Sequence, residues 1–194
     1  MLRRHIFYST RIPQAKKYII DPASITTSPG DVFRGYPRLG VNQGNYTVPL
    51  FDTSGVTSSK ILTVTSAGAI GVNGGYNNAA GALGYGQDSW FTAHYANSGT
   101  TVSYQFTGLN DAAVYELTLI GSRAGSTEVR VTNYTVSGVT KSHQSTTQDG
   151  LGNRTLTSVF SNLKSAGGKL SFSFNAAPGS TFGYLNIIQL VEVV

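Results

Sequence analysis

The chain has 194 residues, of which 40% are hydrophobic, 11% aromatic and 12% charged. The hydrophobic share supports a real core, whereas the charged share is about half that of an average soluble domain, as on many extracellular and virion β proteins. Cysteine is absent, which excludes disulfide bonds, thiolate metal sites and a cysteine nucleophile.

The positive charge is confined to the N-terminal quarter. Residues 1–45 contain seven of the fourteen Lys and Arg residues but two of the nine acidic residues, and the charges of residues 46–194 cancel. We therefore divide the chain into a basic arm, residues 1–45, and a neutral body, residues 46–194. Polar residues interrupt the start before a signal peptide's apolar region forms, and no segment is apolar for long enough to span a bilayer.

The arm contains four of the six prolines and short strand-like runs at residues 6–8 and 18–20. It is too apolar to be left in water, so it either adds an edge strand to its own domain or docks on a neighbouring subunit. Nucleic-acid binding is a lesser alternative, because the seven charges are spread out. The anchoring candidates are Arg3, Arg4, Phe7, Tyr8, Arg11, Lys16, Lys17 and Tyr18.

The sequence of the body predicts a succession of strands. The segment 100–123 is its clearest part: Val102, Tyr104 and Phe106 alternate with polar residues, a turn follows at 108–111, and alternation resumes at Tyr115. Such a pair is an antiparallel hairpin or a sandwich corner. Further strands are expected at 47–51, 61–65, 128–131, 134–136, 155–160, 169–174 and 184–194, with a polar connection at 141–154.

No stretch has the 3.6-residue period of a helix, and this number and spacing of strands indicates a two-sheet β-sandwich or jelly roll. The order of DTSGVTSS, residues 71–78, DSWF, GLNDAAVYELTLIGSR and GYLNIIQL resembles galactose-binding-like jelly-roll modules. Such modules recur as accessory domains in bacterial glycan-active proteins and in phage virion proteins. The resemblance covers about residues 46–194, implies an all-β jelly-roll sandwich, and marks fold more than ligand.

Catalytic signals are weak. The three histidines, His5, His94 and His143, have no signalled acid partner, and no nucleophile elbow is present. Asp88 and Glu116 are the only carboxylates that the segment 100–123 would bring together, and structural roles suit them better. Walker, zinc and EF-hand patterns are absent. We expect no enzymatic activity and no cofactor; the resemblance implies, as an alternative, a structural Ca²⁺ between Asp52 and Glu192.

Sugar binding has more support in the sequence. Sugar sites combine an aromatic ring for the C–H face with amides and carboxylates for the hydroxyls. These residue types gather in and beside the Gly/Asn-rich stretch 66–87. As an alternative, Trp90 and Tyr95 are core residues and the asparagines form turns. The candidate site is Tyr76, Asn77, Asn78, Tyr85, Asp88, Trp90 and Tyr95.

These observations lead to a functional hypothesis of a non-enzymatic virion structural protein. We expect a phage capsid-decoration, head-fibre or tail accessory subunit, made in the host cytoplasm and located in the virion. Its arm would bind other virion proteins by charge or by strand addition, within a homo-oligomer that also contacts surface glycans. Membrane and nucleic acid are not expected as partners. The alternative is a stand-alone carbohydrate-binding module.

Overall fold

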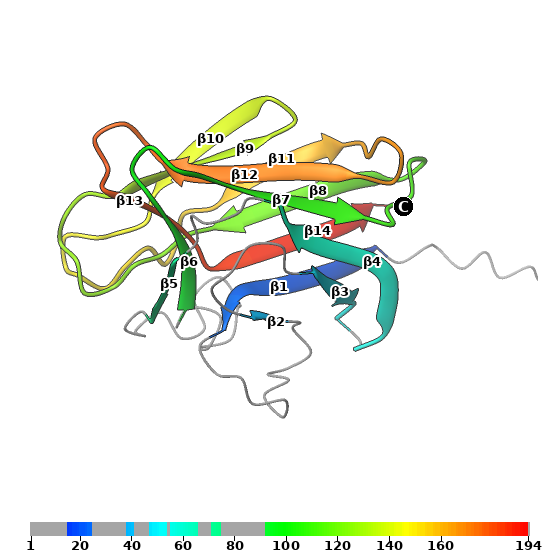
Figure 1. The fold of residues 1–194 in the computed structure, drawn as a ribbon, viewed down its shortest axis with the longest axis horizontal. Helices are drawn as coiled ribbons and strands as arrows, with labels where there is room; N and C mark the ends of the chain where they lie inside the picture. Colours follow the sequence, from blue (N-terminus) through cyan, green and yellow to red (C-terminus); the bar gives the residue numbers. More distant parts are fainter. Residues whose placement is uncertain are drawn as a thin grey trace, which may run out of the picture.

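The computed structural model describes residues 15–24, 38–40, 47–53, 55–65, 71–74 and 92–193. Within these ranges the regular elements are β-strands (Figure 1). No helix in the described ranges is long and apolar enough to cross a membrane. The expected all-β class is therefore confirmed.

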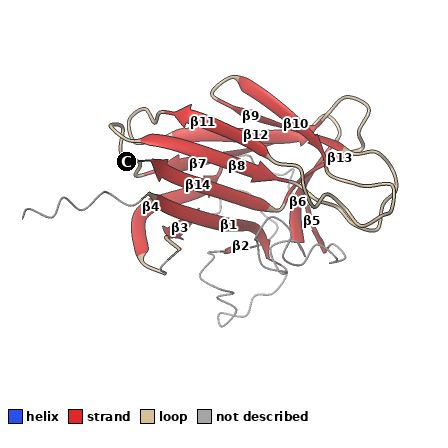
Figure 2. Ribbon diagram, turned by 180° about the vertical axis from the view of Figure 1, so that it is seen from behind, coloured by secondary structure: helices blue, strands red, loops and turns tan. Residues whose placement is uncertain are grey.

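The strands of the described residues form three sheets, and nearly all neighbours are antiparallel. The first sheet, seen face-on in Figure 2, has the order β11 (Ser158–Leu163), β8 (Val114–Ile120), β14 (Ile187–Val193), β1 (Lys16–Ser24) and β2 (Arg38–Gly40). The second has the order β10 (Val139–Gln144), β9 (Val131–Val136), β12 (Leu170–Ala176), β7 (Thr101–Thr107), β4 (Thr57–Val64) and β3 (Thr47–Phe51). The third has the order β13 (Phe182–Leu185), β6 (Thr92–Asn97) and β5 (Gly71–Gly74).

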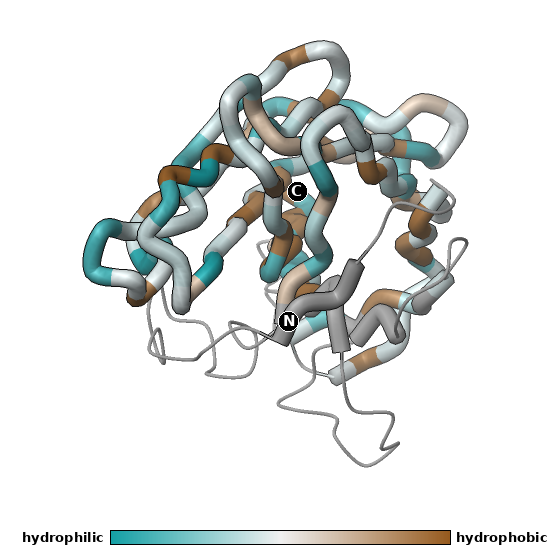
Figure 3. The backbone as a smooth tube through the Cα atoms, turned by 60° about the vertical axis from the view of Figure 1, so that its left-hand side comes forward, coloured by the Kyte–Doolittle hydropathy of each residue, from teal (hydrophilic) through white to brown (hydrophobic). Residues whose placement is uncertain are grey.

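The two larger sheets pack face to face around one core. Buried and more exposed residues alternate along most of these strands, because successive residues of a strand face opposite sides of a sheet. Figure 3 colours the backbone by hydropathy, and hydrophobic and hydrophilic positions follow one another closely along the strands. Tyr104 of β7 stacks on Phe172 of β12, with ring centroids 4.8 Å apart, and both meet Leu117 of β8 in the core cluster. This is the β-sandwich that the alternating pattern predicts.

The segment 100–123 proves to be a sandwich corner rather than a hairpin. Strands β7 and β8 follow one another in the chain but belong to opposite sheets. The Tyr115 hydroxyl accepts a hydrogen bond from the Asn110 N–H at 2.8 Å, and the Asp111 carboxylate accepts one from the Gly168 N–H at 2.9 Å. These bonds fix the turn against the neighbouring β11–β12 connection, so the chain crosses between the sheets at a rigid point.

Part of the arm belongs to the sandwich. Strand β1 pairs with β14 in antiparallel register, and Tyr18 and Ile20 lie in the core with 1% and 0% of their surface exposed. For residues 16–24 the first alternative, addition of a strand to its own domain, is therefore the one observed. The expected strand at 6–8 lies outside the described residues.

This assignment of β1 predicts that Ile20→Ala lowers the free energy of unfolding by about 3 kcal/mol, the usual cost of emptying a buried aliphatic site. Lys16→Ala, at an exposed position of the same strand, should change it by less than about 0.5 kcal/mol. Urea denaturation of both variants checks this. Equal, small effects would show that β1 does not contribute to the core.

Several expected boundaries are wrong. The strands expected at 128–131 and 134–136 are the single strand β9, and the strand expected at 155–160 is β11, which begins at Ser158. The run 184–194 is two strands, β13 and β14, because the chain changes sheets at Asn186, whose buried side chain accepts the Ser122 N–H at 2.6 Å. The connection 141–154 begins with the second half of β10, an edge strand without an alternating pattern because most of its residues are exposed. Lys141 of β10 donates to the Val159 carbonyl of β11 at 2.5 Å and so links the edges of the two sheets.

Candidate functional site

Of the predicted sugar-binding residues, the structure describes Tyr95. The other six, Tyr76, Asn77, Asn78, Tyr85, Asp88 and Trp90, lie outside the described residues. Tyr95 is on β6 and is a partly exposed residue. Its neighbour β5, Gly71–Gly74, lies within the Gly/Asn-rich stretch 66–87, and residues 75–91 lie outside the described residues.

The pairing of β6 with β13 brings a second ring to Tyr95. Phe182, also partly exposed, meets the Tyr95 ring edge-to-face with centroids 5.6 Å apart. Two residues further, Tyr184 lies on the same side of β13, with its ring centroid 6.3 Å from that of Phe182. Alternation along a short strand thus aligns the rings at one end of the sandwich.

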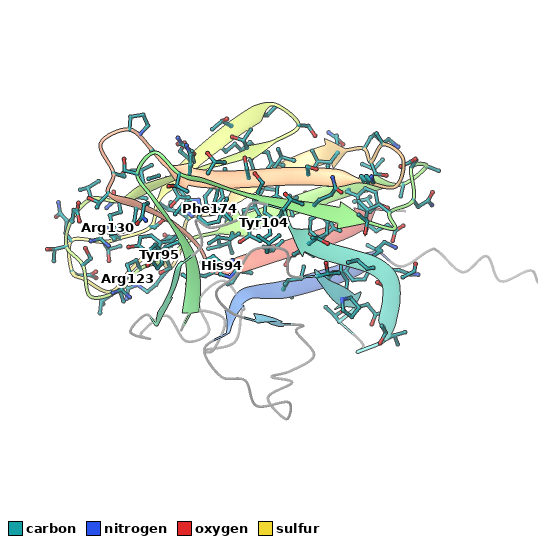
Figure 4. The ribbon with its side chains drawn as sticks, in the orientation of Figure 1. His94, Tyr95, Tyr104, Arg123, Arg130 and Phe174 are labelled. Carbon is teal, nitrogen blue, oxygen red and sulfur yellow. The ribbon has the colours of Figure 1, made fainter. Side chains whose placement is uncertain are left out.

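Arg130 completes this group from the segment before β9. Its guanidinium lies 4.8 Å from the Phe182 ring centroid and donates to the Tyr184 hydroxyl. Its Nε and Nη2 also donate to one oxygen of Glu128, at 2.9 and 2.8 Å. We call Tyr95, Phe182, Tyr184, Arg130 and Glu128 the aromatic–arginine site. In Figure 4, Tyr95 and Arg130 lie at the same end of the sandwich.

The electrostatics of this site are fixed by its hydrogen bonds. The Thr181 hydroxyl and the Arg130 guanidinium hold the pKa of the Glu128 carboxyl below its ordinary value, so the carboxylate is charged at neutral pH. Burial raises the pKa of the Tyr184 hydroxyl, which is therefore neutral. The Glu128 side chain is 47% exposed, whereas the Arg130 side chain is 15% exposed.

A hollow of about 520 Å³ lies beside the loop between β10 and β11, and Val129, which is between Glu128 and Arg130 in the chain, is part of its lining. That loop lies at the same end of the sandwich as Arg130 (Figures 1 and 4). Six of the hollow's nine lining residues carry an amide or a hydroxyl and two are aliphatic, while apolar atoms make up most of the lining surface. The lining residues are Val129, Gln144, Thr146, Thr147, Gln148, Asp149, Asn153, Thr155 and Leu156.

The described histidines have structural roles. His143 Nε2 accepts the Gly121 N–H at 3.0 Å, so its Nδ1 carries the proton and donates to the Ser158 hydroxyl at 3.0 Å. This is the opposite of a catalytic pair, in which histidine accepts the serine proton. His94 bonds the buried Tyr104 hydroxyl at 2.5 Å.

The residues considered for metal and carboxylate chemistry have protein partners. Glu192 forms an ion pair with Lys60 at 3.0 Å, and Asp52 accepts the Val56 N–H at 3.0 Å. Glu116 accepts a hydrogen bond from Ser161 at 2.9 Å, whereas Asp88 lies outside the described residues. Among the residues that the structure describes, no three His, Asp or Glu side chains group as metal ligands.

The structure describes three of the eight anchoring candidates, namely Lys16, Lys17 and Tyr18. Arg3, Arg4, Phe7, Tyr8 and Arg11 lie outside the described part of the chain. Lys16 is exposed and Lys17 partly exposed on β1. Tyr18 is buried, and the Lys60 ammonium lies 5.4 Å from its ring centroid, so this ring packs within its own domain.

The sequence analysis selected Tyr95 as a candidate but not Glu128, Arg130, Phe182 or Tyr184, which the structure places around it. Arg130 and Tyr184 are 54 residues apart, and no local pattern connects them. One signal was present in the sequence: Phe182 and Tyr184 alternate directly after a Pro-Gly turn, as in a short strand whose outer end is exposed.

No protein-family model matches the chain, and no curated protein matches it. Among solved structures, β-glucuronidase 2 of Bacteroides uniformis is 15% identical over 82% of this chain and 20% of that chain, with a TM-score of 0.41. TmCBM61, solved in complex with β-1,4-galactotriose, is 14% identical over 68% of this chain and 88% of that chain, with a TM-score of 0.29. An exo-β-1,3-galactanase from Phanerochaete chrysosporium, solved with galactose, is 12% identical over 77% of this chain and 41% of that chain, with a TM-score of 0.33. The chain thus spans about a fifth of the length of the glucuronidase, and similarity at this level identifies no shared function.

Proposed function

We propose that this protein is a non-enzymatic carbohydrate-binding module whose ligand lies on the aromatic–arginine site. One observation carries the proposal: the rings of two partly exposed residues, Tyr95 and Phe182, stand beside a charged carboxylate and a guanidinium. A ring packs against the C–H face of a sugar, while a carboxylate accepts and a guanidinium donates hydrogen bonds to its hydroxyls.

The site is held rigid before any ligand arrives, which favours binding. Arg130 is fixed by Glu128 and Tyr184, and the second oxygen of Glu128 accepts the Thr181 hydroxyl. Side chains that are already ordered lose little conformational entropy on binding. The rings lie on β6 and β13, two paired strands, so their spacing is also fixed.

The proposal predicts that Tyr95→Ala and Phe182→Ala each weaken sugar binding at least tenfold, equivalent to about 1.4 kcal/mol. Tyr95→Phe keeps the ring and should retain binding, which separates ring stacking from general disturbance. Titration calorimetry with β-1,4-galactotriose, cellotriose and mannotriose measures the effect. Alanine variants that bind as tightly as the intact protein would contradict the assignment of the site.

The virion role stays a prediction, motivated by the excess positive charge of residues 1–45. Because Tyr18 and Ile20 are core residues, the test should remove residues 1–14 and keep β1. Light scattering should then show an oligomer for the full chain and a monomer for the shortened one. Equal masses would contradict arm-dependent assembly.

A further inference from the structure

We infer that the hollow beside the β10–β11 loop is a second sugar subsite, which takes a neutral ring adjacent to the one bound at the aromatic–arginine site. This inference rests on the proposed function and adds a ligand class to it: an oligosaccharide whose second ring carries no charge. Three features support it, namely the shared wall between the two sites, the chemistry of the lining and the rigidity of the hollow.

The two sites share a wall of three residues. Glu128 and Arg130 direct their side chains to the aromatic–arginine site, where they bond each other and contact Thr181 and Tyr184. Val129, between them, lines the hollow. Because residues 128–130 contribute side chains to both sites, an oligosaccharide that crosses this segment would contact both sites.

The lining of the hollow suits a neutral, hydroxyl-rich ring. Gln144 and Gln148 offer amides, and two aliphatic side chains, Val129 and Leu156, are 54% and 47% exposed and can cover a C–H face. Among the described lining residues Asp149 alone carries charge, and Arg154 pairs with it at 2.9 Å. A uronate or sulfated ring would find no Lys or Arg side chain among the lining residues to offset its charge, so a neutral ring is favoured.

The hollow is also fixed in shape. The Thr146 hydroxyl accepts the Arg130 N–H at 3.0 Å and donates to the Glu128 carbonyl at 2.7 Å, which ties the hollow to the shared wall. The buried Asn153 side chain donates to the carbonyls of Gly121 and Leu156 at 3.0 and 2.8 Å and accepts the Leu156 N–H at 2.8 Å. The lining is therefore ordered before a ligand arrives, and its volume of about 520 Å³ is within the range of ligand sites.

Amide NMR titration with neutral trisaccharides (β-1,4-galactotriose, cellotriose and mannotriose), and with trigalacturonic acid as the charged counterpart, tests the inference. We expect a neutral trisaccharide to shift amides at residues 144–156 together with those of Tyr95 and Phe182, and the charged one to bind more weakly. Shifts at Tyr95 and Phe182 alone would overturn the subsite and leave the proposed function standing. If none of the sugars shifts amides at either place, both the subsite and the proposed function are overturned.

A matched pair of variants gives a second readout. Val129 and Val139 are 54% and 55% exposed, but Val139 lies on β10 and is not among the residues that line the hollow. Val129→Asp should weaken binding of the neutral trisaccharide at least fivefold while leaving monosaccharide binding unchanged, and Val139→Asp should alter neither. Leu156→Ser serves the same purpose if Val129→Asp fails to fold. Equal affinities for all three variants would overturn the subsite.

Discussion

Gly121→Ala should destabilise the protein by more than about 4 kcal/mol or prevent folding, an effect reserved for severe overpacking of a core. A methyl group at this position would overlap the Tyr184 carbonyl and the Tyr134 hydroxyl. Neither can move away easily, because the Tyr134 hydroxyl donates to that same carbonyl at 2.6 Å. The Gly121 N–H and carbonyl are in turn bound by His143 and Asn153.

Gly138→Ala provides the control. Gly138 has a φ of +80°, and a methyl group there would meet nothing within 4 Å. Gly138→Ala should lower the free energy of unfolding by about 1–2 kcal/mol, the cost of placing an L-residue in the left-handed backbone region. Denaturant unfolding compares the two variants, and a loss at Gly121 no larger than that at Gly138 would contradict the packing described around β13.

The second large effect concerns pH. Burial lowers the pKa of His94 to about 3 and that of His143 to about 4, and their side chains are 3% and 7% exposed. In the unfolded chain both titrate near pH 6.5. Below that pH the unfolded state binds protons that the folded state does not, so stability is full above about pH 6.5 and falls as the pH decreases.

Each histidine should lower the free energy of unfolding by about 1.4 kcal/mol per pH unit, down to about pH 4 for His143 and about pH 3 for His94. From pH 6.5 to pH 5 the two together remove about 3 kcal/mol, because each histidine is already half protonated in the unfolded chain at pH 6.5. Urea denaturation across this range measures the slope, and His94→Gln or His143→Gln should each halve it. A stability that does not change between pH 7 and pH 5 would show that the histidines are not buried as neutral groups.

Most of the fold could be predicted because it depends on local patterns. Alternation marks β7, β8 and β12, where one face is buried and the other meets water. The same logic failed for β10, because the exposed edge strand has no buried face to enforce a pattern. It also failed at Asn186, where the strand pattern continues although the chain changes sheets.

The site was less predictable because it depends on which distant segments meet. Tyr95 could be selected as an aromatic residue beside an Asn-rich stretch, but Arg130 and Phe182 reach it from two other parts of the chain. Local sequence encodes the exposed face of a strand; it does not encode which loop covers that face. The hollow could not be predicted for the same reason. Its lining residues, 129 and 144–156, come from separate segments that the pairing of β9 with β10 brings together.

The measurement that tests the central claim most directly is binding to a glycan array, with the intact protein and the Tyr95→Ala/Phe182→Ala double variant side by side. The proposed function predicts that the intact protein is retained on a defined set of glycans and that the double variant, still folded by circular dichroism, is retained on none of them. An intact protein that binds no glycan, or a double variant that binds the same set equally well, would contradict it.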